Sequence, residues 1–280
     1  MEFVDFRCKA ISRDIATLFP GWERGETVAF LSPHDDDVVL GGGYLVQAVR
    51  KSGGQVRVFI FCQGDAGYSS LSAKRTIVRT RRREAITSYG ILGVQPSRIH
   101  FLGLPDLSVM TYVNRRVFGH KGLPDELLKL FRRHRISRAV FSSPHFENWD
   151  HTAVYDIGMY VVPQAGDPVL ADLGKAFPVR SSLVYSVWGD FGPASPDSVS
   201  LKADVGILAG EKEERLVRKA LRAFASQAEI MENTVARHRN SRSGPGGHLE
   251  LFQRPRLREP IDYAPYFEII KRGQHVRHRD

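Results

Sequence analysis

The sequence has only two cysteines, Cys8 and Cys62, in 280 residues. That number is too small for a disulfide framework, and their spacing fits no cysteine-based metal site. No uninterrupted apolar run approaches the length of about 18 residues that a membrane-spanning helix needs. The first residues, MEFVDFRCKAISRD, carry acidic side chains and contain no apolar core of signal-peptide length. These absences predict a protein of a reducing, cytoplasmic setting without a membrane span.

Acidic residues are in the minority, with 31 Asp and Glu against 40 Lys and Arg, for a net charge of +9. Such a balance can indicate a nucleic acid or another anionic partner, or only a solvated surface. The arginines are spread over several segments, without interleaved aromatic residues or a known reader motif. We therefore expect no nucleic-acid partner.

Apolar residues make up 42% of the chain and charged residues 25%, as in ordinary globular proteins. The length suits a single α/β domain over residues 1–280. Apolar runs typical of buried strands alternate with segments of helical periodicity. The predicted strands are 26–34, 55–64, 98–104, 138–143 and 181–189, and the predicted helices are 44–54, 74–94, 123–135, 151–162 and 211–231.

This alternation predicts a doubly wound, mostly parallel sheet with helices on both faces. Ligands of such sheets bind beyond the carboxyl ends of the strands. The segment 234–258 is rich in Arg, Ser, Gly and Pro, which predicts a loop over one face. The final ten residues, KRGQHVRHRD, are basic and poor in apolar side chains, which predicts a mobile tail.

Three consecutive carboxylates follow the first predicted strand, in the segment SPHDDDV at 32–38. Adjacent carboxylates repel one another, and burying them without a cation is costly. A neighbouring histidine favours a transition metal, because imidazole and carboxylate are ordinary Zn²⁺ ligands. On its own, this segment fits an exposed acidic helix cap equally well.

A second polar cluster, PHFENWDH at 144–151, follows the fourth predicted strand. His151 begins a predicted helix, and Asp150 before it fits a helix cap or a carboxylate that orients an imidazole. Carboxyl ends of parallel strands lie at one edge of the sheet. Two such clusters at one edge favour a single metal site.

These residues resemble the N-acetylglucosaminyl-phosphatidylinositol de-N-acetylase family, also called PIG-L or LmbE-like. HDDDVVLGGG (34–43) is similar to the family's first motif, His-Pro-Asp-Asp-Glu before a glycine-rich helix start, and NWDH (148–151) to its second. The resemblance implies a Rossmann-like fold and a Zn²⁺-dependent deacetylase. It also implies that His34, Asp37 and His151 bind one zinc ion per chain and that Asp36 is the general base.

Later segments resemble the family in the same order. The stretch around Arg81 and the segment FLGLPD, ending at Asp106, are similar to the part of the family in which an Arg and an Asp contact the sugar. RKALRAFASQ (218–227) resembles a late helix that ends in Ser-Gln. The resemblance covers about residues 26–230, which leaves 231–280 as a C-terminal loop and helix extension.

The sequence departs from the family pattern at three positions. Asp35 replaces the usual Pro, Val38 replaces the usual Glu, and Asn148 stands where many members carry a His. An Asn amide can donate a hydrogen bond to an oxyanion but cannot carry a proton. His145 or His248 could supply that proton instead.

The resemblance thus implies removal of an N-acetyl or similar acyl group from an amino-sugar-type small molecule. One alternative is a hydrolase of another amide, for instance in tailoring a natural product. Another is a catalytically weakened metal-binding homologue, which Asn148 keeps open. Nothing in the sequence indicates the acceptor, the oligomeric state or which of Zn²⁺, Fe²⁺, Mn²⁺ and Co²⁺ is bound.

Overall fold

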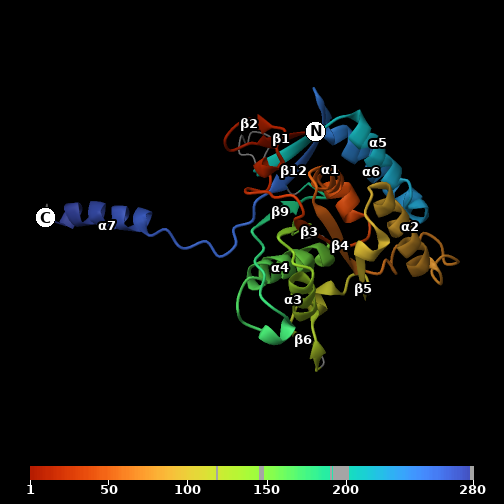
Figure 1. Cartoon of the computed structure of the whole chain (residues 1–280), viewed down its shortest axis with the longest axis horizontal. Helices are drawn as coiled ribbons and strands as arrows, with labels where there is room; N and C mark the ends of the chain where they lie inside the picture. Colours follow the sequence, from red (N-terminus) through yellow and green to blue (C-terminus); the bar gives the residue numbers. More distant parts are fainter. Residues whose placement is uncertain (118, 145–147, 190, 192–201, 278–280) are drawn as a thin grey trace.

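The computed structural model describes residues 1–117, 119–144, 148–189, 191 and 202–277. A mixed sheet forms its centre (Figure 1). Five neighbouring strands of this sheet are parallel, which confirms the α/β fold and the five predicted strands. In spatial order they are β5 (Ile99–Leu104), β4 (Gln55–Cys62), β3 (Thr27–Ser32), β8 (Arg138–Ser142) and β9 (Ser181–Tyr185).

Helices cover both faces of the sheet and give the molecule two apolar cores (Figure 1). One core contains apolar side chains of α1 (Asp37–Lys51), α2 (Ile77–Ile91) and α5 (Glu211–Leu221). The other contains those of α3 (Leu123–Arg133) and α4 (Trp149–Gln164). The sheet is therefore buried on both sides, as its continuous apolar strands require.

The chain reverses its direction of winding between β3 and β8. From β3 it runs outward to β4 and β5, and it then returns to the other side of β3 with β8 and β9. Such a switch point opens a crevice at the carboxyl ends of the two central strands. The segments after β3 and β8, at 33–37, 143–144 and 148–151, lie at this point.

The sheet continues beyond β9 with antiparallel strands that the sequence did not predict. They are β12 (Gly247–Gln253), β10 (Val205–Ala209), β1 (Glu2–Asp5) and β2 (Ala10–Ser12), with β11 (Ser243–Gly244) paired to β12. The predicted loop over 234–258 is therefore wrong. In β12 every second residue is buried, but two of these three, His248 and Glu250, are polar, which hides the strand pattern.

The predicted helix 211–231 is also wrong in its extent. The structure divides this region into α5, a short 3-10 helix at Ala225–Gln227 (η5) and α6 (Ala228–Arg242). Further along, the expected mobile tail is helical up to Arg277 in α7 (Ala264–Arg277), which projects away from the body (Figure 1). A small separate sheet pairs β6 (Arg116–Val117) with β7 (His120–Lys121). Among the described residues, no helix combines the length and apolarity needed to cross a membrane.

Helix α1 is kinked at Gly42, whose φ of −145° and ψ of 19° are not helical. The kink releases backbone groups that two charged side chains then bind. The buried Glu250 carboxylate accepts hydrogen bonds from the N–H groups of Tyr44 and Leu45, at 3.1 and 2.9 Å. Arg242 donates to the carbonyl of Leu40 and lies 3.8 Å from Glu250. The kink thus separates the first turn of α1, which begins at Asp37, from the rest of the helix, and Glu250 and Arg242 stabilise it.

Candidate metal centre

The three predicted ligands lie close together at the switch point. His34 lies between β3 and α1, Asp37 begins α1, and His151 lies in the first turn of α4. One donor atom of each lies within 4.8 Å of the other two. Asp37 and His151 are buried, and the His34 side chain is 16% exposed. Two segments more than a hundred residues apart in the sequence therefore form one cluster, as the sequence predicted.

The spacing of these atoms fits a tetrahedral metal ion. Asp37 Oδ2 lies 3.2 Å from His34 Nδ1 and 3.3 Å from His151 Nε2. Ligands bound to Zn²⁺ at tetrahedral angles are about 3.3–3.4 Å apart, given usual Zn–N and Zn–O lengths. Both separations are longer than most N–H···O hydrogen bonds. The donor set of two imidazoles and one carboxylate is also one that catalytic zinc uses.

Asp150 orients His34 from the other side of the imidazole ring. Its Oδ2 lies 3.3 Å from His34 Nε2, while its oxygens accept hydrogen bonds from the N–H groups of Leu107 and Val109. A carboxylate behind a ligating histidine is the common arrangement at metal sites, because it fixes the ring and its tautomer. The orienting role of Asp150 at a metal-binding histidine stays a prediction.

The pKa shifts in the cluster show that its carboxylates stabilise a positive charge next to them. Burial disfavours protonation of His34, but Asp150 and Asp37 outweigh it and raise the pKa of the imidazole well above its ordinary value. For Asp37, burial acts to raise the pKa, yet His151 and His34 hold it well below its ordinary value. Each shift has the direction that attraction between carboxylate and cation produces.

Asp36, the predicted general base, lies at the N-terminus of α1 beside Asp37, and its side chain is 15% exposed. It makes no hydrogen bond that caps the helix, so the structure does not support a capping role. Burial raises the pKa of Asp36; Arg81 opposes part of this rise, and Asp37 adds to it. Raising the pKa of a carboxylate makes it a better proton acceptor.

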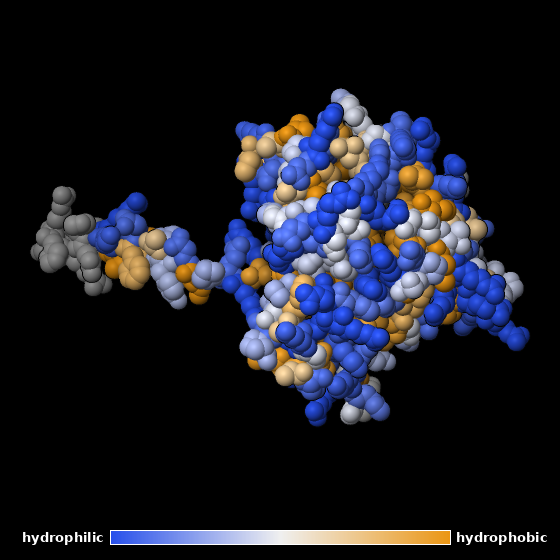
Figure 2. Space-filling model, in the orientation of Figure 1, coloured by the Kyte–Doolittle hydropathy of each residue, from blue (hydrophilic) through white to orange (hydrophobic). Residues whose placement is uncertain are grey.

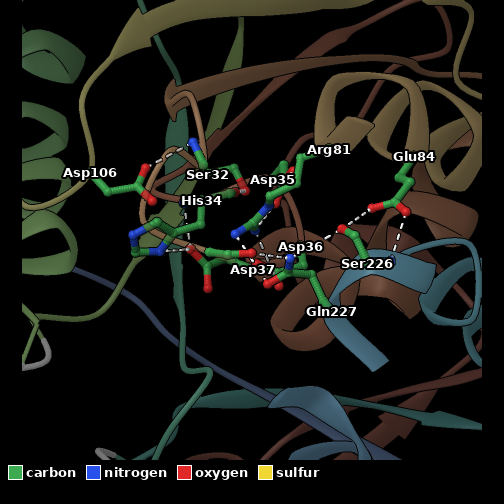
Figure 3. A network of polar contacts seen from close by, with 12 residues as sticks. Ser32, His34, Asp35, Asp36, Asp37, Arg81, Glu84, Asp106, Ser226 and Gln227 are labelled. Atoms are coloured by element: carbon green, nitrogen blue, oxygen red, sulfur yellow. Dashed lines mark hydrogen bonds and ion pairs between the residues drawn. The ribbon is translucent and has the colours of Figure 1, made fainter. Parts of the chain in front are cut away.

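Arg81 is buried, with a side chain 6% exposed, and binds protein groups (Figure 3). Its guanidinium donates to both oxygens of Asp35 and lies 3.7 Å from Asp36. Burial opposes its charge, yet Asp35 and Asp36 raise the pKa of Arg81. Asp35, which replaces the family's usual Pro, thus has a structural role that the sequence did not reveal. Contact between Arg81 and a substrate stays a prediction.

The short helix η5 is bound to α2 next to this pair (Figure 3). Ser226 donates to Glu84 through its hydroxyl at 2.6 Å and through its N–H at 2.8 Å. Gln227 accepts a hydrogen bond from Arg81 at 3.3 Å and donates to the carbonyl of Gly67 at 2.7 Å. The Ser-Gln pair noted in the sequence therefore secures Arg81 and the loop after β4.

Asp106 connects the loops that follow β4 and β5. Its two carboxylate oxygens accept hydrogen bonds from the N–H groups of Gly64 and Ala66, at 2.8 and 2.9 Å. An oxygen of Asp106, the thiol of Cys62 and a ring nitrogen of His34 also lie within 4.8 Å of one another. Asp106 is thus beside the site, where its predicted contact with a sugar remains a prediction.

Asn148 caps α4, since its side-chain oxygen accepts a hydrogen bond from the N–H of Asp150 at 3.0 Å. Its predicted action on an oxyanion would use the amide nitrogen and stays a prediction. His145 lies outside the described residues. His248, the alternative proton carrier, is on β12, where its ring nitrogens lie 2.8 Å from Glu211 and 3.0 Å from Ser243.

Large apolar side chains are exposed in the segments that follow the strands at this edge of the sheet. Leu107 and Met110 follow β5, Trp149 follows β8, and Trp188 follows β9, with exposed fractions of 61, 40, 65 and 46%. Tyr185, at the end of β9, is instead buried in the core. The exposed side chains offer apolar surface beside a polar site.

The family model for GlcNAc-PI de-N-acetylase, PIG-L, matches residues 29–162. These residues form a PIG-L family domain. The domain runs from β3 to α4, so it contains all three candidate ligands together with Asp36 and Asp150. Helix η5, which contacts α2 and Arg81, and strand β12 lie outside this domain. No curated protein matches the chain by sequence.

Solved structures share the fold well beyond the PIG-L domain. The N,N'-diacetylchitobiose deacetylase of Pyrococcus horikoshii has a TM-score of 0.68 at 20% identity, covering 86% of this chain and 87% of that one. The A40926 pseudoaglycone deacetylase Dbv21 has 0.59 at 18%, with 86% and 100% covered. GalB of Pseudomonas putida KT2440, a 4-carboxy-2-hydroxymuconate hydratase, has 0.61 at 15%, with 85% and 100% covered. The fold is thus common to deacetylases and a hydratase.

Proposed function

We propose that this protein is a metal-dependent N-deacetylase that acts on an acylated amino sugar or a related small molecule. The observation that carries the proposal is the cluster of His34, Asp37 and His151 at the switch point, with Asp36 beside it. The family model and the similarity to two deacetylases support the same reaction.

His34, Asp37 and His151 would hold one Zn²⁺ per chain. A bound Zn²⁺ lowers the pKa of a water molecule towards about 7 and polarises a carbonyl oxygen. Asp150 keeps the His34 ring in the orientation that directs Nδ1 towards Asp37. Asp35 and Asp106 accept hydrogen bonds from Arg81 and from backbone N–H groups, whereas Asp36 makes no helix-capping hydrogen bond.

Asp36 would act as the base. It accepts a proton as a water oxygen bonds to the amide carbon, and it returns the proton to the nitrogen as the C–N bond breaks. The products are a carboxylate, acetate for an acetyl group, and a free amine. Arg81, paired with Asp35, keeps a positive charge 3.7 Å from Asp36 and thereby limits the rise in the pKa of Asp36. An Asn148 amide directed at the carbonyl oxygen would stabilise the negative charge that develops there.

The proposed substrate has a polar amide end and a less polar remainder. Asp106 lies beside His34, and exposed side chains such as Trp149 and Leu107 follow neighbouring strands. Sugar rings combine hydroxyl groups with an apolar face that packs on aromatic side chains. An amide of another class, such as a natural product under modification, would meet the same groups.

Acetate release from N-acetylglucosamine and its glycosides, with zinc-loaded protein, tests the proposal. Asp36→Asn should lower kcat by about 10²–10⁴, as loss of a general base does, and should leave zinc bound. Asp172→Asn, at a carboxylate 71% exposed, is the control and should keep full activity. Zinc-loaded wild type that releases no acetate from any acetylated amine, but hydrates an unsaturated acid, would favour a hydratase like GalB.

The same assay separates an active enzyme from a weakened homologue. Asn148 fixes the start of α4 through its oxygen, which favours a structural role for this residue. If Asn148→His raises turnover from a trace to a robust rate, the wild type is a weakened enzyme. If the wild type is already robust and the variant gains nothing, Asn148 is sufficient for catalysis.

A further inference from the structure

Residues 261–270, which include the first half of α7 (Ala264–Arg277), form an apolar surface that the rest of the described chain leaves uncovered. Figures 1 and 2 show this helix projecting from the body, with hydrophobic residues along it. Six of the thirteen exposed large apolar side chains of the described chain lie within these ten residues. They are Ile261, Tyr263, Tyr266, Phe267, Ile269 and Ile270, each 53–69% exposed.

The helix has two chemically different sides. Tyr266, Phe267 and Ile270 are three and four residues apart, so they share one side of α7. Glu268, Lys271 and Arg272 have the same spacing and share the other side, where Lys271 lies 3.1 Å from Glu268. The ten residues 271–280 contain four Lys or Arg and one Asp. An apolar side with aromatic residues thus lies opposite a positively charged one.

This combination is typical of helices that lie in the interface of a membrane. Their apolar side enters the boundary between headgroups and acyl chains, and their Lys and Arg attract anionic lipids. Tyrosine is enriched at this depth because its ring is apolar and its hydroxyl is polar. We propose that α7 and residues 261–263 bind the surface of an anionic lipid bilayer and attach the deacetylase body to it.

A second copy of the chain could instead cover the apolar side of α7, but the short length of the helix disfavours this. At 14 residues the helix spans two heptads, whereas a coiled coil sustains its pattern over three or four. Gly273 also weakens the helix interior. A lipid surface needs no matching partner helix, so it suits a short amphipathic segment better.

Co-sedimentation of the full-length protein with phosphatidylcholine vesicles, with and without phosphatidylserine, tests this proposal without any substrate. We expect binding to the vesicles that contain phosphatidylserine. Phe267→Glu/Ile270→Glu should weaken that binding by at least about tenfold, because two apolar side chains no longer enter the bilayer. Lys271→Gln/Arg272→Gln should weaken it about fivefold for each charge, and added salt should weaken the wild type similarly.

Ile11→Glu is the matched control, since Ile11 is 65% exposed on β2 of the body, and its binding should be that of the wild type. All variants should keep the unfolding midpoint of the wild type, because the substituted side chains are exposed. The proposal is overturned if the wild type stays in the supernatant with both vesicle types. It is also overturned if the wild type is a dimer that Phe267→Glu/Ile270→Glu converts to a monomer.

Discussion

Asp150 holds the His34 ring through the nitrogen that faces away from Asp37. We predict that Asp150→Asn weakens zinc binding by about 10–100-fold, because the ring loses the carboxylate that fixes its orientation. Zinc affinity measured by competition with a chelator checks this. Asp156→Asn, at an exposed position further along α4, is the control and should not change the affinity. Equal affinity in wild type and Asp150→Asn would show that Asp150 serves only to bind the N–H groups of Leu107 and Val109.

At the residue scale, the sequence indicated the candidate ligands and missed some of the contacts that support them. Residue type and position indicate two polar clusters, each at the end of an apolar run, and the family resemblance singles out His34, Asp37 and His151 within them. The partner of Arg81 could not be found in the same way. Asp35 and Arg81 are 46 positions apart, and only the packing of α2 over the switch point brings them together.

Helix α1 approaches its neighbours through its glycines. A Cβ atom at Gly41 would overlap the Tyr185 ring, and one at Gly43 would lie 2.9 Å from Val217. We predict that Gly41→Ala lowers the free energy of unfolding by about 1–3 kcal/mol, as overpacking in a core does. Gly90→Ala in α2, where nothing lies within 4 Å, should instead raise it by about 0.5–1 kcal/mol. Urea unfolding of both variants checks the pair, and equal effects would contradict the close approach.

Glu250, which binds the kinked part of α1, should make the free energy of unfolding depend on pH. Burial raises the pKa of Glu250 to about 7, although Arg242 and the backbone N–H groups of α1 oppose the rise. In the unfolded chain the same carboxyl ionises near its ordinary value of about 4.5. Between these values the folded protein binds the proton more strongly, so unfolding releases it and stability falls as pH rises.

We predict that the free energy of unfolding falls by about 3 kcal/mol more in the wild type than in Glu250→Gln between pH 4.5 and 7. Above pH 7 the two curves should run in parallel, because Glu250 is then ionised in both states. Urea unfolding across this pH range checks the difference. Parallel curves throughout would show that Glu250 is ionised in the fold at every pH in the range.

At the element scale, the parallel half of the sheet could be predicted and the antiparallel half could not. Strands β3, β4 and β8 are continuous apolar runs because helices cover both faces. In the other half, β1 and β2 have only four and three residues, and β12 has Glu250 at a buried position. That carboxylate is buried because the kinked α1 supplies N–H donors to it, which is a tertiary effect.

At the scale of the whole molecule, the proposed metal centre would join two segments that belong to opposite sides of the switch point. An ion held by both segments binds the folded chain and not the unfolded one, so it should stabilise the entire fold. We predict that zinc at about 100 times its Kd raises the free energy of unfolding by about 2.7 kcal/mol. Thermal unfolding with zinc and with a chelator checks this, and His151→Ala should show no such difference.

The metal content of the purified protein decides whether His34, Asp37 and His151 bind a metal ion. Elemental analysis should compare the wild type with Asp37→Ala and His151→Ala, and circular dichroism should confirm that each variant is folded. We predict about one zinc per wild-type chain and none in either folded variant. A wild type that holds no metal even after reconstitution would contradict the metal centre and, with it, the proposed deacetylase.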